Sequence, residues 1–280
     1  MGLVLPVRHQ PALPASLIRE EVPSPEAIEL DVLIIGAGPA GLACAIQLAR
    51  SAPDLAIGVL EKAGALGEHS LSGAVINPVA LRALFPDLAD ADFPLRQPVS
   101  GEAVYFLTES RATRIPTPPT MKNHGNFVAS LSEVVRWMGE QAEALGVNLF
   151  PGVPAEALLV DGDQVIGVRT VPAGLDRESQ PTGNYQEPTD LTAKVVVLAE
   201  GTRGPLAEAW REWQGIRSEN PQIFALGVKE VWEVTRPLDR VIHTMGWPLP
   251  HDAFGGSWCY PMGPSQVSIG LVALDGKVTL

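Results

Sequence analysis

Cysteine is scarce in this 280-residue sequence, which holds only Cys44 and Cys259, far apart in the chain. An iron–sulfur cluster needs four cysteine ligands, and the sequence contains neither a Cys-x-x-Cys pair nor a cluster of Cys with His. Its five histidines stand at no metal-binding or catalytic-triad spacing. We therefore predict no metal site and no acid–base catalytic residue, and the sparse cysteines fit a reducing, cytosolic compartment.

Positive charge is also in short supply, because 20 Lys and Arg residues stand against 32 Asp and Glu residues, a net charge of −12. Nucleic-acid binding requires a basic patch, and attachment to anionic lipid requires a cluster of Lys and Arg. The acidic balance argues against both, so we predict no nucleic-acid partner.

The sequence has one long apolar stretch, residues 30–49, and three glycines and a proline interrupt it. A strand, a turn and a helix explain these interruptions better than a membrane-spanning helix does. The first 14 residues lack the basic start and the unbroken apolar core of a signal peptide. We predict no signal peptide, no transmembrane helix and an extended, Pro-rich arm over residues 1–28.

Residues 31–62 give the strongest positive signal in the chain. Residues 32–35 form an apolar, mostly β-branched run that is typical of a strand buried on both faces. The apolar face of residues 40–50 predicts a helix, and a second apolar strand over residues 56–60 ends at Glu61. Gly36, Gly38 and Gly41 stand between the first strand and the helix in the spacing G-x-G-x-x-G, the dinucleotide-binding fingerprint.

Each residue of this fingerprint has a physical task. Gly36 permits the tight turn after the strand, Gly38 lets a pyrophosphate approach the backbone, and Gly41 lets the helix pack close to the strand. The helix N-terminus offers free N–H groups to the phosphates, and Pro39 is tolerated there because its missing N–H would have no helical partner. Glu61 is placed to accept hydrogen bonds from ribose hydroxyls, so the sequence predicts a dinucleotide site.

The length and the order of the elements predict two domains. We expect a hairpin at residues 103–116, an amphipathic helix at 130–145 and a strand pair at 156–171. A mobile polar loop is expected at 172–188, and four further strands at 192–199, 225–231, 240–245 and 267–274. Most of the six tryptophans are expected in the core or at a domain interface. The sequence thus predicts an α/β fold: an FAD-binding, Rossmann-like βαβ sheet of the glutathione-reductase type, assembled from separate segments, with an inserted α+β substrate or quinone domain.

Several longer motifs resemble one enzyme family. They are GAGPAGLACAIQLAR, LGEHSLSGA, WMGEQAEALGV and HTMGWPL, in this order along the chain. The sequence is similar to the N-terminal half of electron transfer flavoprotein–ubiquinone oxidoreductases of the bacterial type. This resemblance implies an enzyme with FAD, a 4Fe-4S cluster and a bound quinone, which passes electrons from reduced electron transfer flavoprotein to ubiquinone.

The resemblance also implies site residues, motif by motif. The residues expected to hold the FAD pyrophosphate are Gly36, Gly38, Pro39, Ala40 and Gly41. Glu61 is expected at the adenosine ribose, and Lys62 is expected among the cofactor-binding residues. The loop near the flavin ring is expected at Ser72, Gly73 and Ala74, and the end of the cofactor site at Gly201. The quinone head group is expected at Phe254, Gly255 and Gly256.

Domain limits follow from the same resemblance. We expect an FAD-binding domain at 29–100 and 146–215, a membrane- and quinone-facing hairpin and helix at 101–145, and part of a quinone-binding domain at 216–280. The apolar surface of that hairpin is expected from Val104, Tyr105, Phe106, Leu107 and Ile115, with a plain hairpin packed on the core as the alternative. The family's iron–sulfur domain, its cluster cysteines and its second, Gly-Asp FAD segment have no counterpart in this sequence.

The family resemblance implies peripheral attachment at the cytoplasmic face of the bacterial inner membrane. Two alternatives stay open. One is a different FAD-dependent dehydrogenase or reductase, such as a geranylgeranyl-reductase-like enzyme, although no second dinucleotide fingerprint is visible for NAD(P)H. The other is a non-catalytic FAD-binding fragment.

Overall fold

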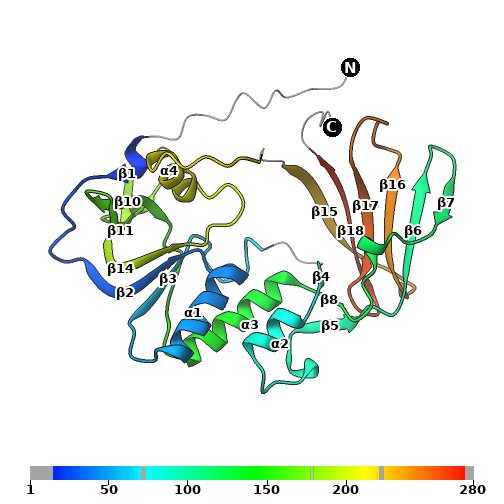
Figure 1. The fold of residues 1–280 in the computed structure, drawn as a ribbon, viewed down its shortest axis with the longest axis horizontal. Coiled ribbons are helices and arrows are strands. Elements are labelled where there is room, and N and C mark those ends of the chain that lie inside the picture. Colours follow the sequence, from blue (N-terminus) through cyan, green and yellow to red (C-terminus); the bar gives the residue numbers. More distant parts are fainter. Residues whose placement is uncertain (1–14, 71–73, 177, 179, 221–223, 275–280) are drawn as a thin grey trace. The chain divides into compact units, whose positions relative to one another are not determined.

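Two units, each with its own large β-sheet, make up the chain in the computed structural model, which describes residues 15–70, 74–176, 178, 180–220 and 224–274 (Figure 1). Of the described residues, the seven-stranded unit contains those within 15–70 and 132–218. The six-stranded unit contains those within 74–131 and 219–274. The chain leaves the seven-stranded unit and returns to it, so that sheet is assembled from separate segments, and the predicted α/β fold is confirmed.

The sheet of the seven-stranded unit has the strand order β1-β10-β11-β14-β2-β3-β9, in which β14, β2, β3 and β9 run parallel. In chain order its strands are β1 (Ile18–Arg19), β2 (Ile28–Ile35), β3 (Ile57–Glu61), β9 (Asn148–Pro151), β10 (Ala155–Asp161), β11 (Gln164–Thr170) and β14 (Asp190–Leu198). The second half of β2 is buried on both faces, as its unbroken apolar run predicts.

The helices of this unit are α1 (Pro39–Ser51), α3 (Leu131–Ala144, in this unit from residue 132 on), α4 (Pro205–Trp213) and the short 3-10 helix η1 (Ala15–Leu17). Helix α1 packs against β2 and β3 and buries Leu42 and Ile46 completely. Leu33 on β2 joins Leu158 on β10 and Leu206 on α4 in a second apolar cluster. Burial of both faces fixes β2, and therefore the turn that follows it.

The six-stranded unit has the strand order β15-β18-β17-β16-β6-β7. In chain order these strands are β6 (Glu102–Leu107), β7 (Ala112–Ile115), β15 (Ala225–Glu233), β16 (Val241–Gly246), β17 (Gly255–Pro261) and β18 (Gln266–Leu274). A smaller sheet has the order β4 (Ala74–Ile76), β8 (Phe127–Ala129) and β5 (Leu95–Pro98). The unit also contains α2 (Val79–Leu84), η2 (Asp90–Asp92) and η3 (Pro119–Met121). Val128 of the small sheet and Val241 of the large one share a core cluster with Val99 and Met262.

Most predicted elements are confirmed within a residue or two, and one is wrong. The polar stretch 172–188 was expected as a mobile loop, but it contains the hairpin of β12 (Ala173–Leu175) and β13 (Pro181–Gln186). All of β13 is exposed, so no apolar alternation marks it as a strand. Backbone pairing holds the hairpin instead, together with a hydrogen bond that the Thr182 hydroxyl donates to the Gly174 carbonyl at 2.7 Å.

The unit boundaries differ from the expected domain limits in two places. Residues 72–100 group with the six-stranded unit, because β4 and β5 pair with β8 there. Helix α3 groups with the seven-stranded unit, where Gly139 approaches Leu66 and Leu149. Of the expected N-terminal arm, residues 1–14 lie outside the described residues, and β1 pairs with β10.

A buried ion pair joins β11 to the start of β14. Asp190 is 2% exposed, and its carboxylate accepts two hydrogen bonds from the Arg169 guanidinium, at 2.8 and 2.9 Å. The backbone N–H of Ser24 donates a third, at 2.8 Å. Hydrogen bonding to Arg169 lowers the pKa of Asp190, so this carboxylate is charged throughout the neutral range.

Candidate functional site

The turn between β2 and α1 borders a cavity of about 400 Å³ in the seven-stranded unit. Gly36, Gly38, Pro39 and Ala40 line it. Gly36 has a φ of +104°, and a Cβ on it would lie 2.5 Å from the carbonyl oxygen of Ala199. The turn therefore requires glycine at this position for both its conformation and its space.

Gly41 and Gly38 differ in the space around them. A Cβ on Gly41 would lie 2.0 Å from the carbonyl oxygen of Gly36, so only glycine lets α1 begin this close to the turn. A Cβ on Gly38 would meet no protein atom within 4 Å, and the φ of Gly38 is an ordinary −73°. Since the protein itself does not require glycine at position 38, the open space beside it fits a ligand that approaches the backbone closely.

The start of α1 supplies hydrogen-bond donors for an anionic ligand. Gly38 is the N-cap residue, and no side chain caps the first N–H groups of the helix. Uncapped N–H groups and the helix dipole together bind phosphate at such positions. Lys62 and Arg203 line the same cavity and add positive charge.

Glu61, at the end of β3, is held by two backbone groups. Its Oε2 accepts the N–H of Ala37 at 3.0 Å, and its Oε1 accepts the N–H of Ala63 at 2.9 Å. Each carboxylate oxygen retains a lone pair after these bonds, so the fixed carboxylate can still accept ribose hydroxyls. Its position on the cavity wall fits that task.

The turn after β14 contributes more to this cavity than the sequence pattern indicated. Glu200 lines it and caps α4, accepting the N–H of Ala207 at 2.7 Å and that of Leu206 at 3.3 Å. Burial raises the pKa of Glu200. Arg203 has a φ of +60°, rare for a residue with a side chain, and it also lines the cavity. No motif marks Glu200 or Arg203, since the sequence indicates only a small-residue turn here.

Most residues predicted to hold the cofactor come together in this cavity. Those that line it are Gly36, Gly38, Pro39, Ala40, Glu61, Lys62 and Gly201. Gly41 lies directly behind the turn. Ser72 and Gly73 lie outside the described residues, and Ala74 begins β4 in the six-stranded unit.

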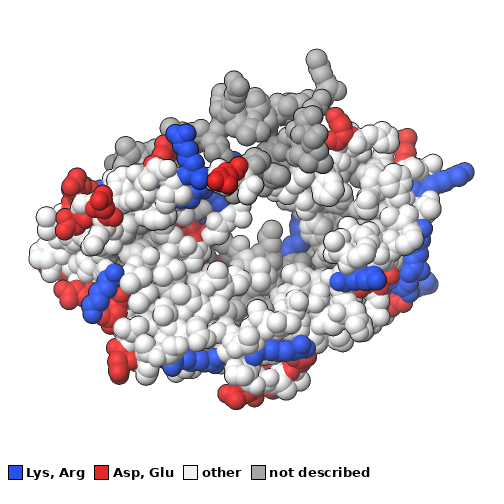
Figure 2. Space-filling model, in the orientation of Figure 1, with Lys and Arg blue, Asp and Glu red and all other residues white. Residues whose placement is uncertain are grey.

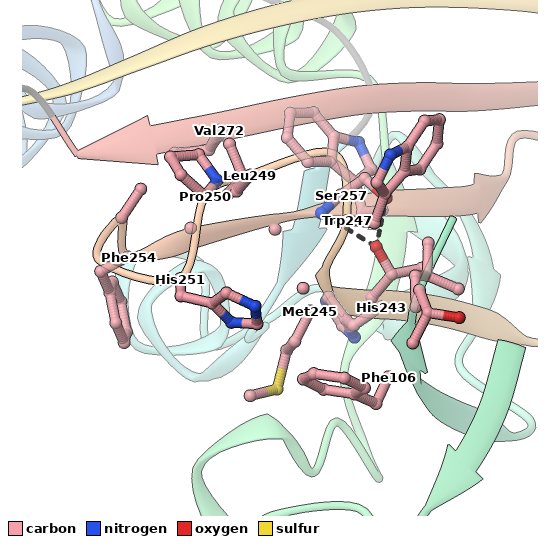
Figure 3. Close-up of a pocket in the computed structure, with 18 of the residues that line it drawn as sticks. Phe106, His243, Met245, Trp247, Leu249, Pro250, His251, Phe254, Ser257 and Val272 are labelled. Carbon is pink, nitrogen blue, oxygen red and sulfur yellow. Dashed lines mark hydrogen bonds between the residues drawn. The ribbon is translucent and has the colours of Figure 1, made fainter. Parts of the chain in front are cut away.

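A second cavity, of about 600 Å³, lies in the six-stranded unit (Figure 3). Phe254, Gly255 and Gly256, the residues predicted at the quinone, all line it. Its other walls are mainly apolar, and the close-up shows Phe106 and Met245 on one side with Leu249, Pro250 and Val272 on the other. Such a cavity fits a largely apolar ligand that carries a few polar atoms.

The cavity lies where two strands part. Strands β16 and β17 pair at three positions, the last of which sets Thr244 opposite Ser257. Beyond it β16 follows β6 to Gly246, whereas Gly255 and Gly256 pair with β18. The three glycines line the space between the strands, where glycine backbone can present N–H and C=O groups to a ligand oxygen.

A group of polar side chains continues from this cavity into the wall of the unit. His243 Nε2 and the Tyr260 hydroxyl are hydrogen-bonded at 2.8 Å, and their rings meet edge to face. Burial lowers the pKa of His243, an effect that Glu102 opposes, and burial raises the pKa of Tyr260 to about 12. This hydrogen bond therefore joins two uncharged groups at neutral pH.

Four buried polar atoms near this pair have no hydrogen-bond partner among the described residues: Glu102 Oε2, His243 Nδ1, Trp258 Nε1 and Ser268 Oγ. The register of β6, β16, β17 and β18 puts these four side chains on one face of the sheet. Buried polar atoms of this kind commonly bind internal water.

Gly270 makes space for the indole of Trp258, which lines the cavity. A Cβ on Gly270 would lie 2.2 Å from Trp258 Cζ2. Gly270→Ala is expected to displace the ring and lower the free energy of unfolding by about 1–3 kcal/mol. Urea unfolding and near-ultraviolet circular dichroism measure the two effects. Gly183→Ala is the control, because a Cβ there meets nothing within 4 Å, and an equal loss in both variants would contradict this role.

One expectation about apolar side chains needs correction. Of the five hairpin residues expected to form an exposed apolar surface, only Phe106 is exposed, and Val104 is fully buried against the core. Most of the six tryptophans were expected in the core or at an interface, and of the six only Trp232 and Trp247 are more than half exposed. Strand alternation points Val104 and Tyr105 to opposite faces of the sheet, which the apolar composition of the run alone does not reveal.

The described residues contain neither a candidate membrane-spanning helix nor a candidate metal-binding group. No helix there is long and apolar enough to cross a membrane. No group of three or more His, Cys, Asp or Glu side chains in this part of the chain is arranged to hold a metal ion.

Solved structures similar to this chain include flavin-dependent enzymes. A geranylgeranyl bacteriochlorophyll reductase-like protein from Thermoplasma acidophilum matches with a TM-score of 0.63 and 21% identity, over 88% of this chain and 57% of its own. The flavin-dependent brominase Bmp2 matches with a TM-score of 0.58 and 20% identity, over 87% of this chain and 56% of its own. CtdE, solved in complex with FAD, matches with a TM-score of 0.58 and 15% identity, over 87% of this chain and 59% of its own.

Sequence relatives are closer. The mitochondrial electron transfer flavoprotein–ubiquinone oxidoreductase of Dictyostelium discoideum is 41% identical over 90% of this chain and 43% of its own length. The enzyme of Pseudomonas aeruginosa is 40% identical over 88% of this chain and 47% of its own length. The human enzyme is 40% identical over 88% of this chain and 42% of its own length. Family models also match: ETF-QO, ubiquinone-binding, at residues 224–277, and the Thi4 family at residues 22–84.

The fold and the glycine-lined cavity define a class, since the chain has the architecture of FAD-dependent oxidoreductases. Its relatives narrow this class. By sequence the chain is similar to electron transfer flavoprotein–ubiquinone oxidoreductases, and it spans less than half the length of the curated relatives it matches.

Proposed function

We propose that this chain binds FAD in the cavity of the seven-stranded unit and a quinone in the cavity of the six-stranded unit. In this proposal it takes part in electron transfer from reduced electron transfer flavoprotein to ubiquinone. Electron transfer flavoprotein and ubiquinone are the partners, and peripheral contact with the cytoplasmic face of the bacterial inner membrane is the location. The names of the relatives and the two cavities support this proposal.

The observation that carries the cofactor assignment is the contrast among three glycines. Two of them, Gly36 and Gly41, are required by neighbouring backbone, whereas Gly38 faces open space. The start of α1 and Arg203 would hold the pyrophosphate, and Glu61 the adenosine ribose. When bound, FAD supplies the chemistry that accepts two electrons and releases them one or two at a time.

On the quinone side, the chain's own residues supply shape and hydrogen bonds. The backbones of Gly255 and Gly256 would meet a quinone oxygen, and the apolar walls would exclude water from the ring. Phe254 lines the cavity but has no hydroxyl to donate. Cys44 and Cys259 cannot supply the four ligands of an iron–sulfur cluster, so no step on this chain is assigned to one.

The visible spectrum of the purified chain, supplied with FAD, tests this function. We expect a bound-flavin spectrum that bleaches when reduced electron transfer flavoprotein is added and recovers with a short-chain ubiquinone. Direct bleaching by NAD(P)H would contradict the proposal and favour a reductase of the geranylgeranyl-reductase type. Bound flavin that no partner reduces would instead identify a non-catalytic FAD-binding fragment.

A further inference from the structure

The cavity of the six-stranded unit has few ionisable groups in its walls. Among the described residues that line it, these are Glu109, His243 and His251, and none is a lysine or an arginine. Figure 2 shows lysine and arginine side chains spread over the visible face, with wide uncharged areas between the charged groups. Reduction of a quinone turns two carbonyl oxygens into hydroxyls, so it consumes two protons along with two electrons. The proton sources at this cavity are therefore three side chains and water.

Two of these three side chains are poor proton donors. His243 Nε2 is hydrogen-bonded to Tyr260, and His243 Nδ1 is buried. Burial lowers the pKa of His243, so its ring is neutral at neutral pH and is closed to direct exchange with solvent. Glu109 lies exposed in the turn between β6 and β7, and an ionised carboxylate accepts hydrogen bonds but donates none.

His251 differs from both, because it is in contact with solvent and with the cavity. It lies in the loop of residues 247–254, which joins β16 to β17, and it is exposed. It also lines the cavity, and Figure 3 shows its ring pointing inward, toward Met245. Histidine is the side chain that gains and loses a proton in neutral solution. A histidine in this position can take a proton from bulk water and pass it to a ligand in the cavity.

Backbone hydrogen bonds hold His251 in this position. The N–H of Ala253 donates to the Pro250 carbonyl at 3.1 Å, which closes a tight turn with His251 as its second residue. The N–H of Leu274 donates to the Phe254 carbonyl at 2.9 Å and ties the end of the loop to β18. The loop therefore presents His251 at a fixed place beside the cavity.

The charges around His251 are few. The ionisable side chains that share its loop or its cavity are Asp252, Glu109 and His243, of which two are acidic and the third is neutral. Among the described residues that line the cavity, none supplies a second proton donor that titrates near neutral pH and meets solvent. A pH dependence of proton transfer in the neutral range is therefore expected to come from His251.

We propose that His251 is a proton donor to the quinone that this cavity binds. An N–H bond of its imidazolium breaks as an O–H bond forms on the nearest carbonyl oxygen of the ligand, and the two electrons come from the reduced flavin. The neutral imidazole regains its proton from bulk water, and the second oxygen of the ligand takes its proton from water. This inference rests on the proposed function, since it takes the ligand to be a quinone. The histidine spacing predicted no acid–base residue, because only the folded loop brings His251 to the cavity wall.

Anaerobic stopped-flow mixing tests the role of His251. The 280-residue chain, loaded with FAD and photoreduced, is mixed with a short-chain ubiquinone, and reoxidation of the flavin is followed by its absorbance. We expect the wild-type rate to fall as the pH rises from about 6 to about 9, because the fraction of imidazolium falls. His251→Ala is expected to react about 100-fold more slowly at the low end of this range and to lose the pH dependence.

Chemical rescue and a matched variant distinguish proton donation from a structural role. Imidazole in the buffer is expected to restore the rate of His251→Ala, which a damaged fold would not allow. His124→Ala is the control, because His124 is an exposed histidine of the same unit but does not line the cavity. The control is expected to keep the wild-type rate and pH profile, and thermal unfolding checks that both variants fold. A wild-type rate or pH profile in His251→Ala, or an equal loss in the control, would overturn the proposal.

A binding measurement without flavin separates this proposal from the proposed function. In the chain with isotope-labelled histidine, a short-chain ubiquinone is expected to shift the imidazole NMR signals of His251 but not those of His124. Ubiquinone that quenches tryptophan fluorescence, and so binds, without shifting His251 would refute the proton donor alone. No binding at all would refute the proposed quinone site, and bound ubiquinone that leaves the wild-type flavin reduced would refute the proposed electron transfer. Either of these two results would also remove the role of His251.

Discussion

Gly38→Ala is expected to abolish FAD binding while the chain stays folded. A Cβ at position 38 meets no protein atom within 4 Å, and alanine adopts the φ of −73° without strain. As an N-cap residue alanine is poorer than glycine, so we expect the free energy of unfolding to fall by less than about 1 kcal/mol. The methyl group would occupy the space that the pyrophosphate needs, and we expect the affinity for FAD to fall by about 100-fold or more.

Gly41→Ala is the informative comparison. Its Cβ would lie 2.0 Å from the Gly36 carbonyl oxygen, and neither backbone can move without separating α1 from β2. We expect a loss on the order of 3 kcal/mol or more in the free energy of unfolding, in the absence of FAD as well as in its presence. Urea unfolding without cofactor and a flavin fluorescence titration separate the two variants. If Gly38→Ala binds FAD like the wild type, the cofactor does not lie at this turn.

Asp190→Ala is expected to cause the largest loss of stability among single changes outside the glycine turn. The variant leaves the partly buried Arg169 guanidinium without its two-bond partner and removes the acceptor of the Ser24 N–H. Breaking a buried ion pair from one side costs about 3–5 kcal/mol. Glu21, which is half exposed, still contacts Arg169, so we expect a loss near 3 kcal/mol.

The same pair makes a pH prediction. Because the folded pKa of Asp190 is lowered, its contribution to stability is full above the unfolded pKa near 3.8 and disappears as the pH falls through the folded value. Asp190→Ala should therefore show a shallower fall in stability below pH 4 than the wild type. Asp239→Ala is the control, since its pair with Arg240 is exposed, and no measurable change is expected. An equal response of the two variants would contradict the importance of burial.

The sequence predicted the glycine turn well because local physics determines it. An apolar run buried on both faces, a helix with one apolar face and three glycines at fixed spacing leave few other arrangements. Helix α1 and strand β3 follow the prediction within a residue at each end, and β2 ends where predicted but begins four residues earlier. Glu61 was recognised for the same reason, since it stands at the end of β3 beside the turn.

Features that depend on contacts between residues far apart in the chain could not be predicted from the sequence. Strand β17 was missed because it begins with two glycines and takes its place from pairing with β16 and β18. Arg203 lines the cavity beside the glycine turn only because β14 returns beside β2. The exposure of Trp247 and Phe254 depends on which face of a sheet a loop covers, which composition does not encode.

The parting of β16 and β17 has a consequence for how the proposed quinone site can change during evolution. A Cβ on Gly255 would lie 2.1 Å from the Val272 carbonyl oxygen, and one on Gly256 would lie 2.1 Å from that of Thr244. Strand packing by itself therefore keeps both positions as glycine, whatever the ligand. Recognition through these backbones would be inherited unchanged, and a preference for one ring substituent over another would have to evolve at neighbouring side chains such as Met245 and Trp258, which line the same space.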